Sequence, residues 1–100
     1  MGRDTVGLEM NDWFDELARR LVETAKERGA QIASPELAPP VADEVLELAR
    51  VAAHTKERRF APLACFMAGV AVERLRQAGS LPAAEEAAYL RAIREGMEET

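Results

Sequence analysis

The sequence NDWFDELARRLVETAKERG, residues 11–29, has the pattern of an amphipathic helix. Its apolar side chains recur at intervals of three and four residues, which gathers them on one face. Asn11 is a favoured N-cap, acidic residues complement the helix dipole in the first turn, and Gly29 is a typical C-terminal stop. The apolar face contains Trp13, Phe14, Leu17, Ala18, Leu21, Val22 and Ala25. These features predict a helix over about residues 11–28 whose apolar face forms half of a core.

Three more helices are predicted downstream of a linker. Residues 30–39 include two prolines, which push the residue before each of them away from helical geometry. Pro40 and Pro62 each suit the first position of a helix, where the missing N–H would have no partner, and Ser80 is a favoured cap for the last helix. The predicted helices cover residues 40–53, 62–78 and 81–96.

The third predicted helix carries a stripe of large apolar side chains beside several small residues. The stripe consists of Leu63, Phe66, Met67, Val70 and Leu75. The small residues keep part of this helix narrow, so that the backbone of a neighbour can approach closely. We therefore expect the third helix at the centre of the fold. The fourth helix is richer in alanine, and we expect it to cap the core rather than to build it.

The composition predicts one globular, all-α domain. The chain has 100 residues, of which 48% are apolar and 31% charged, a mixture typical of folded proteins. We expect a compact three- to four-helix bundle over residues 11–100, preceded by a flexible extension over residues 1–10. The longest uncharged run, Phe60 to Val72, is too short to cross a bilayer and contains a proline, so it predicts a buried core helix and no membrane span.

Charge and cysteine content restrict the environment and the partners. The formal net charge of −5 argues against partners that need an overall basic protein, so we expect neither nucleic acid nor an anionic membrane surface. Cys65 is the only cysteine, which excludes an intramolecular disulfide and fits a reducing cytoplasm. Because Cys65 lies in the apolar third helix, we expect it to act as a small buried hydrophobe.

No catalytic constellation is visible in the sequence. The glycines stand singly, so there is no phosphate-cradling loop, and the only histidine, His54, is separated from Cys65 by a predicted helix boundary. His54 and Glu57 make two ligands where zinc needs three or four, so we expect no metal and no cofactor. A minimal enzyme using those two residues is the weaker hypothesis, because a general base also needs a cleft. Trp13 heads an apolar stripe and is expected in the core rather than at a partner interface.

Positive charge gathers just before the third predicted helix. The candidate residues for an anion or partner site are Arg50, His54, Glu57, Arg58 and Arg59. Exposed N–H groups at a helix start, the dipole and one or two guanidinium groups together suit a phosphate or a carboxylate. The alternative is that Arg50 and Arg58 pair with nearby glutamates, among them Glu44, Glu47 and Glu57, and brace the turn. We favour bracing, because most charge runs are solvated or locally paired.

Several short motifs resemble those of a small bacterial helical domain family of unknown function. They are Asp12-Trp13, the run from Leu48 to His54, Glu57-Arg58, Ala61-Pro62-Leu63, Phe66 and Gly69. The resemblance spans about residues 12–72, and Arg59 and Phe60 depart from the family pattern. The family is found alone or fused to guanylyltransferase-like proteins of molybdenum-cofactor biosynthesis, and no catalytic role is carried over from it.

Two functions follow as hypotheses. The resemblance implies a non-enzymatic accessory or interaction domain linked to molybdenum-cofactor biosynthesis, with a guanylyltransferase-like protein or a second copy of itself, in a homodimer, as the partner. The alternative, which comes from the residues, is a domain that binds a small molecule or phosphate at the basic turn of residues 50–62.

Overall fold

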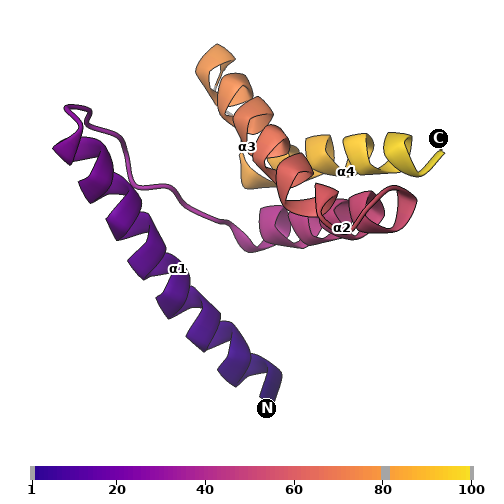
Figure 1. Ribbon diagram of the computed structural model, residues 1–100, viewed down its shortest axis with the longest axis horizontal. Coiled ribbons are helices and arrows are strands. Elements are labelled where there is room, and N and C mark those ends of the chain that lie inside the picture. The colour runs from indigo at the N-terminus through magenta and orange to yellow at the C-terminus, as the bar shows by residue number, and fades with distance from the viewer. Residues whose placement is uncertain (1, 80–81, 100) are drawn as a thin grey trace. The chain divides into compact units, whose positions relative to one another are not determined.

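The computed structural model describes residues 2–79 and 82–99, with side chains for residues 12–79 and 82–98. Within these ranges the chain forms four α-helices and no strand (Figure 1). The helices are α1 (Gly2–Glu27), α2 (Pro39–Thr55), α3 (Phe60–Ala78) and α4 (Ala83–Glu99). The all-α prediction is therefore confirmed.

The helix bounds differ from the predicted ones mainly at the two ends of the chain. α1 begins at Gly2 instead of near Asn11, and α4 continues past Gly96 to Glu99. The predicted stop at Gly29 is correct: this residue has φ 89°, in the left-handed region that glycine adopts at least cost. Its N–H donates to the carbonyl of Lys26 at 3.0 Å, and that of Ala30 donates to Ala25 at 2.9 Å. These two bonds complete a Schellman cap. The predicted cap Ser80 lies outside the described residues.

The chain divides into two units, residues 1–36 and residues 37–100. In the first unit α1 is the only helix among the described residues, and no other element of that unit covers its apolar face. Trp13 is 61% exposed, and its ring meets the Phe14 ring edge to face at a centroid distance of 5.0 Å. Within this unit nothing buries Trp13, and the expectation that it is a core residue of the whole domain stays a prediction. The predicted domain arrangement, with a flexible extension and one domain over residues 11–100, stays a prediction.

In the second unit, α2 is the helix that packs against both of the others. Glu44 pairs with Arg91, and Arg50 pairs with Glu98 further along both helices, so α2 and α4 run parallel. α3 starts next to the C-terminal end of α2 and leads back toward the N-terminal end of α4, as Figure 1 shows. The expectation that α3 lies at the centre is therefore wrong: α2 holds that position.

The core of the second unit is built from one side of each helix. Val41 from α2, Val72 from α3 and the fully buried Leu90 from α4 form its centre. Leu48 and Val51 continue the buried face of α2 at helical spacing. Partly buried side chains surround the centre: Ala38, Val45, Ala68, Ala83 and Tyr89. α4 thus builds the core instead of capping it, because a leucine and not an alanine occupies its most buried position.

A network of charged side chains joins α2 to α4. Glu44 is buried and accepts hydrogen bonds from Nε of Arg91 at 3.0 Å and from Nε of Arg94 at 3.3 Å. Arg94 also donates to Glu98 at 3.2 Å, and Glu98 accepts a hydrogen bond from Arg50 at 3.3 Å. The hydrogen bond from Arg91 is the largest cause that lowers the pKa of the Glu44 carboxyl. The network keeps a buried carboxylate paired on both oxygens, which is the condition for burying charge without a large penalty.

A second ion pair ties α3 to the first turn of α4. Arg76 donates to the buried Glu86 through Nε at 2.5 Å and through Nη2 at 2.9 Å, the two-pronged geometry that guanidinium and carboxylate groups favour. This hydrogen bonding lowers the pKa of Glu86 and raises that of Arg76. Among the described residues, no buried side-chain nitrogen or oxygen is left without a partner.

We predict that stability falls steeply in acid because Glu44 and Glu86 have lowered pKa values. Both carboxyls titrate near 4.5 when unfolded and lower when folded, so their stabilising effect is complete above 4.5 and is lost as the pH falls through the folded values. Urea midpoints measured from neutral to acid pH test this. The double variant Glu44→Gln and Glu86→Gln should flatten the acid limb, whereas the exposed Glu95→Gln should leave its slope unchanged. Equal slopes for wild type and the double variant would contradict the assignment.

Candidate functional site

The candidate basic turn begins on the last turns of α2 and ends at the start of α3. Arg50 pairs with carboxylates of both α2 and α4: its Nε donates to Glu47 of α2 at 3.0 Å, and its Nη2 donates to Glu98 of α4 at 3.3 Å. The first of these bonds is the main cause that raises the pKa of Arg50. The predicted pairing of Arg50 with a glutamate of its own helix is thus confirmed. The ion pair with Glu98 links Arg50 of α2 to α4.

The remaining residues of the turn are exposed and only partly paired. Arg59 donates to the carboxylate of Glu57 at 2.7 Å, so Glu57 pairs with Arg59 and not with Arg58. Arg58 and His54 are exposed and have no side-chain hydrogen bond or ion pair within the described residues. The structure therefore places His54, Glu57, Arg58 and Arg59 close together along the chain, whereas Arg50 contacts Glu47 and Glu98 instead.

The start of α3 has fewer free backbone N–H groups for binding an anion than the sequence suggested. The N–H of Phe60 donates to the carbonyl of Glu57 at 2.9 Å, and the N–H of Ala61 donates to Arg58 at 3.2 Å. Pro62 has no N–H. Since free N–H groups are what make a helix start bind anions, this geometry favours bracing over phosphate binding.

Cys65 behaves as a structural thiol. It is partly buried, its Sγ lies 3.7 Å from the carbonyl oxygen of Val45, and desolvation raises the pKa of the thiol. A raised pKa keeps the group protonated and weakly nucleophilic. Among the described residues, no group of three or more His, Cys, Asp or Glu side chains could hold a metal ion, and no helix could span a membrane.

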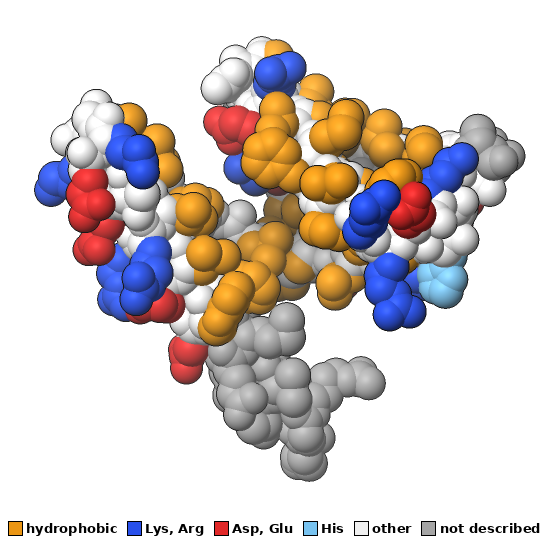
Figure 2. Space-filling view, viewed as in Figure 1, with side chains coloured by type: hydrophobic (Ala, Val, Ile, Leu, Met, Phe, Trp, Pro, Cys, Tyr) orange, Lys and Arg blue, Asp and Glu red, His pale blue; other side chains and the backbone are white. Residues whose placement is uncertain are grey.

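The most unusual surface of the second unit is a line of apolar side chains along α3. Leu63 is 62% exposed, and Phe66 and Met67 are each 73% exposed. Together with the half-buried Val70, they stand at the three- and four-residue spacing that defines one helix face. We call these four residues the α3 row. Figure 2 shows hydrophobic side chains gathered over α3. Within the second unit, the prediction that this stretch is a buried core helix holds for the side with Val72 and is wrong for the side with the α3 row.

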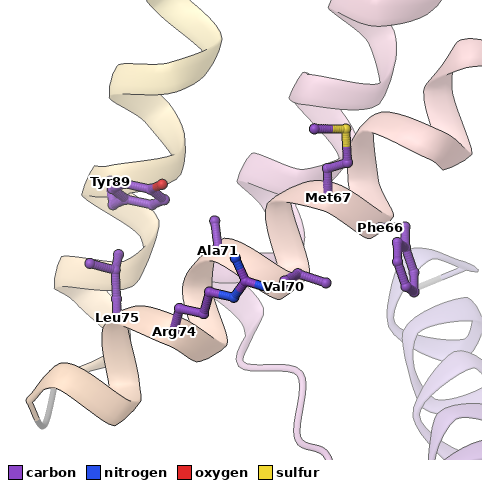
Figure 3. A pocket seen from close by; sticks show the side chains of 7 residues that line it. All are labelled: Phe66, Met67, Val70, Ala71, Arg74, Leu75 and Tyr89. Carbon is purple, nitrogen blue, oxygen red and sulfur yellow. The ribbon is translucent and has the colours of Figure 1, made fainter.

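An open groove adjoins the α3 row. It is lined by Phe66, Met67, Val70, Ala71, Arg74 and Leu75 of α3 and by Tyr89 of α4. Leu75 and Tyr89 face each other across the two helices, while Phe66 points to the other side of α3 (Figure 3). Such an apolar surface is a common feature of protein docking sites, because water leaves it at a free-energy gain. Arg74 contributes the only charged side chain of this lining.

The surface was not predicted because the same pattern serves cores and interfaces. A three- and four-residue apolar period shows that one face of α3 avoids water, but not what covers it. The covered side of α3 includes Val72 and the small residue Ala68, whereas the large residues point outward. The sequence does contain one sign of an exposed face on α3, which is that small and large apolar residues occupy two different sides of the helix.

Comparison with known protein families matches residues 6–100 to a domain of unknown function, DUF6457. The chain belongs to this family. Comparisons with curated proteins and with solved structures find no match. The DUF6457 match extends past the predicted resemblance at residues 12–72 and includes α4, so the buried pairs that α4 makes lie inside the family domain.

We predict that inorganic phosphate causes no localised response at the turn of this DUF6457 domain. Arg50 and Arg59 are already paired, and two backbone donors are occupied. Amide NMR titration with phosphate, against chloride at equal ionic strength, should give similar small shifts over residues 54–63. Saturable shifts confined to this segment, and lost in Arg58→Ala, would instead establish the phosphate-binding alternative.

Proposed function

We propose that this chain is a non-catalytic interaction domain that docks a partner protein on the α3 row. One observation carries the proposal: Leu63, Phe66 and Met67 are large, adjacent on one helix face and mostly exposed. Leaving such a face in water costs free energy, at about 25 cal/mol for each Å² of apolar surface. A partner that covers it recovers that energy.

The chemistry of the row suits a helical partner. Aromatic residues and methionine are enriched at interfaces, and methionine adapts its shape to the surface that it meets. The groove beside the row offers the Tyr89 ring and the aliphatic stem of Arg74 as flanks. An amphipathic helix laid along α3 would place its own apolar residues between these side chains.

The proposed partner is a guanylyltransferase-like protein of molybdenum-cofactor biosynthesis. The support for this partner is the motif resemblance, which includes Leu63 and Phe66 of the docking surface. The link is therefore inferred from the family and not from an observed contact. In this account the domain supplies no catalytic group, and its role is to hold or position the enzyme in the cytoplasm. The phosphate-binding function is the weaker proposal, because Arg50 and Arg59 already have carboxylate partners.

We predict that Leu63→Gln weakens binding to a cognate guanylyltransferase-like protein by about tenfold or more, as loss of a central apolar contact does at interfaces. Calorimetry with the two purified proteins measures this. Leu46→Gln is a matched control, since Leu46 on α2 is also 62% exposed but lies outside the row. Glutamine keeps helix propensity close to that of leucine. The proposal fails if the proteins do not associate, or if both variants weaken binding equally.

A further inference from the structure

We propose that the partner helix docked on the α3 row carries acidic residues at both ends of its apolar face, which pair with Lys56 and Arg58 before the row and with Arg74 after it. This inference rests on the proposed function, because it names the chemistry of the partner for the same surface. The partner is an amphipathic helix whose apolar residues are flanked by Asp or Glu on each side.

The basic side chains of the second unit fall into two groups. Most of its arginines have a carboxylate partner within the unit, namely Arg50, Arg59, Arg76, Arg91 and Arg94. The remaining basic side chains, those of Lys56, Arg58 and Arg74, are exposed and have no ion pair within the described residues of this unit. Acidic residues outnumber basic ones in the chain as a whole, so a shortage of carboxylates does not explain these unpaired charges.

The unpaired basic residues lie at the two ends of the α3 row. Lys56 and Arg58 belong to the turn that leads into α3, ahead of Leu63. Arg74 follows Val70 by four residues, so it continues the same helix face. From Leu63 to Arg74 the helix rises about 16 Å, at roughly 1.5 Å per residue. The row is thus an apolar strip with positive charge at either end.

Arg74 is placed to reach a residue of a helix docked on the row. Its side chain extends along α3 toward Ala71 and Val70, so the guanidinium group lies beside the apolar lining of the groove (Figure 3). The neighbouring Glu73 pairs with Arg76 instead. A carboxylate on the docked helix therefore meets a guanidinium group that has no competing carboxylate within the described part of the unit.

The apolar contacts and the flanking charges act together. An exposed cation alone holds a free anion weakly, because water and salt screen the attraction. A carboxylate that apolar contacts have already brought beside the cation makes the same pair at a smaller cost in entropy. Charges at the rim of an interface fix orientation and exclude wrong partners more than they add affinity. The flanking basic residues therefore select among amphipathic helices and do not bind small anions on their own.

The first helix of this chain matches only part of the required charge pattern. Asp12 and Asp15 stand near the beginning of its apolar residues. Its end has Lys26 and Arg28 on either side of Glu27, which leaves a net positive charge there. In either direction, a helix with these two ends puts positive charge next to a basic end of the row. The charge pattern therefore favours a partner helix that is acidic at both ends.

Synthetic peptides test the pattern with the full-length protein. Each peptide is an amphipathic helix held by a side-chain crosslink, with leucines at three- and four-residue spacing and with Glu, Gln or Lys in the turns before and after them. Fluorescence anisotropy of the labelled peptides gives the dissociation constants. We expect the Glu peptide to bind about tenfold more tightly than the Lys peptide, with the Gln peptide between them. The preference should shrink at high salt, which screens the charges.

Variants of the protein assign the preference to the flanking basic residues. The triple variant Lys56→Gln, Arg58→Gln and Arg74→Gln should bind the three peptides with similar affinity. The matched control, Glu57→Gln with Arg59→Gln, removes a cation of the same turn whose charge is already balanced by its partner, so it should keep the preference. Circular dichroism confirms that the variants are folded.

The inference is overturned if the Lys peptide binds as tightly as the Glu peptide, or if the triple variant keeps the preference. Leu63→Gln should weaken the binding of every peptide, since all of them use the same apolar contacts. Binding that Leu63→Gln leaves unchanged occurs away from the row and also overturns the inference. So does a wild-type protein that binds no peptide, as when α1 of the same chain covers the row.

These outcomes are distinct from those that test the proposed function. Equal binding of the three peptides removes the charge pattern and leaves docking on the row intact. A preference for the Glu peptide, without any association with the guanylyltransferase-like protein, keeps the charge pattern and removes that protein as the partner.

Discussion

The parallel packing of α2 on α4 is the interaction on which the second unit depends. It buries Leu90 and Val41 and, beside them, a carboxylate at Glu44 that two arginines of α4 must neutralise. A buried carboxylate is tolerated only while its hydrogen bonds are made, so this contact is specific as well as apolar. Because α2 lies in the middle of the second unit, α3 packs mainly against α2, and its opposite face points away from the unit's core.

Within the second unit, that outer face carries the α3 row. The small and medium side chains of α3, such as Ala68 and Val72, point to the core, and the large ones form the α3 row. If burial alone had shaped this helix, the large residues would be expected inside, where they remove most surface from water. Their position outside, next to an open groove that Tyr89 helps to line, is the observation on which the proposed docking function rests.

Sequence patterns predicted the local features and not the long-range ones. Helical periods, prolines and Gly29 located all four helices, because these signals act within one turn. The Arg50 to Glu47 pair was foreseeable for the same reason, since its partners are three residues apart. The partners of Glu44 lie on another helix, and the pairing of Glu86 with Arg76 depends on how α3 returns to α4. The sequence pointed to the basic turn because a cluster of arginines is visible in sequence, and that site stays a prediction. The exposure of Phe66, by contrast, follows only from how the helices pack.

The most direct test of the docking surface is site-specific photo-crosslinking in the cell. A photoreactive phenylalanine analogue placed at Phe66 should capture a defined protein, identified by mass spectrometry, and the same analogue at Leu46 should capture none. Capture from Phe66 of either a guanylyltransferase-like protein or a second copy of the chain supports a docking function for the α3 row. No specific product from Phe66, or the same products from both positions, would contradict it.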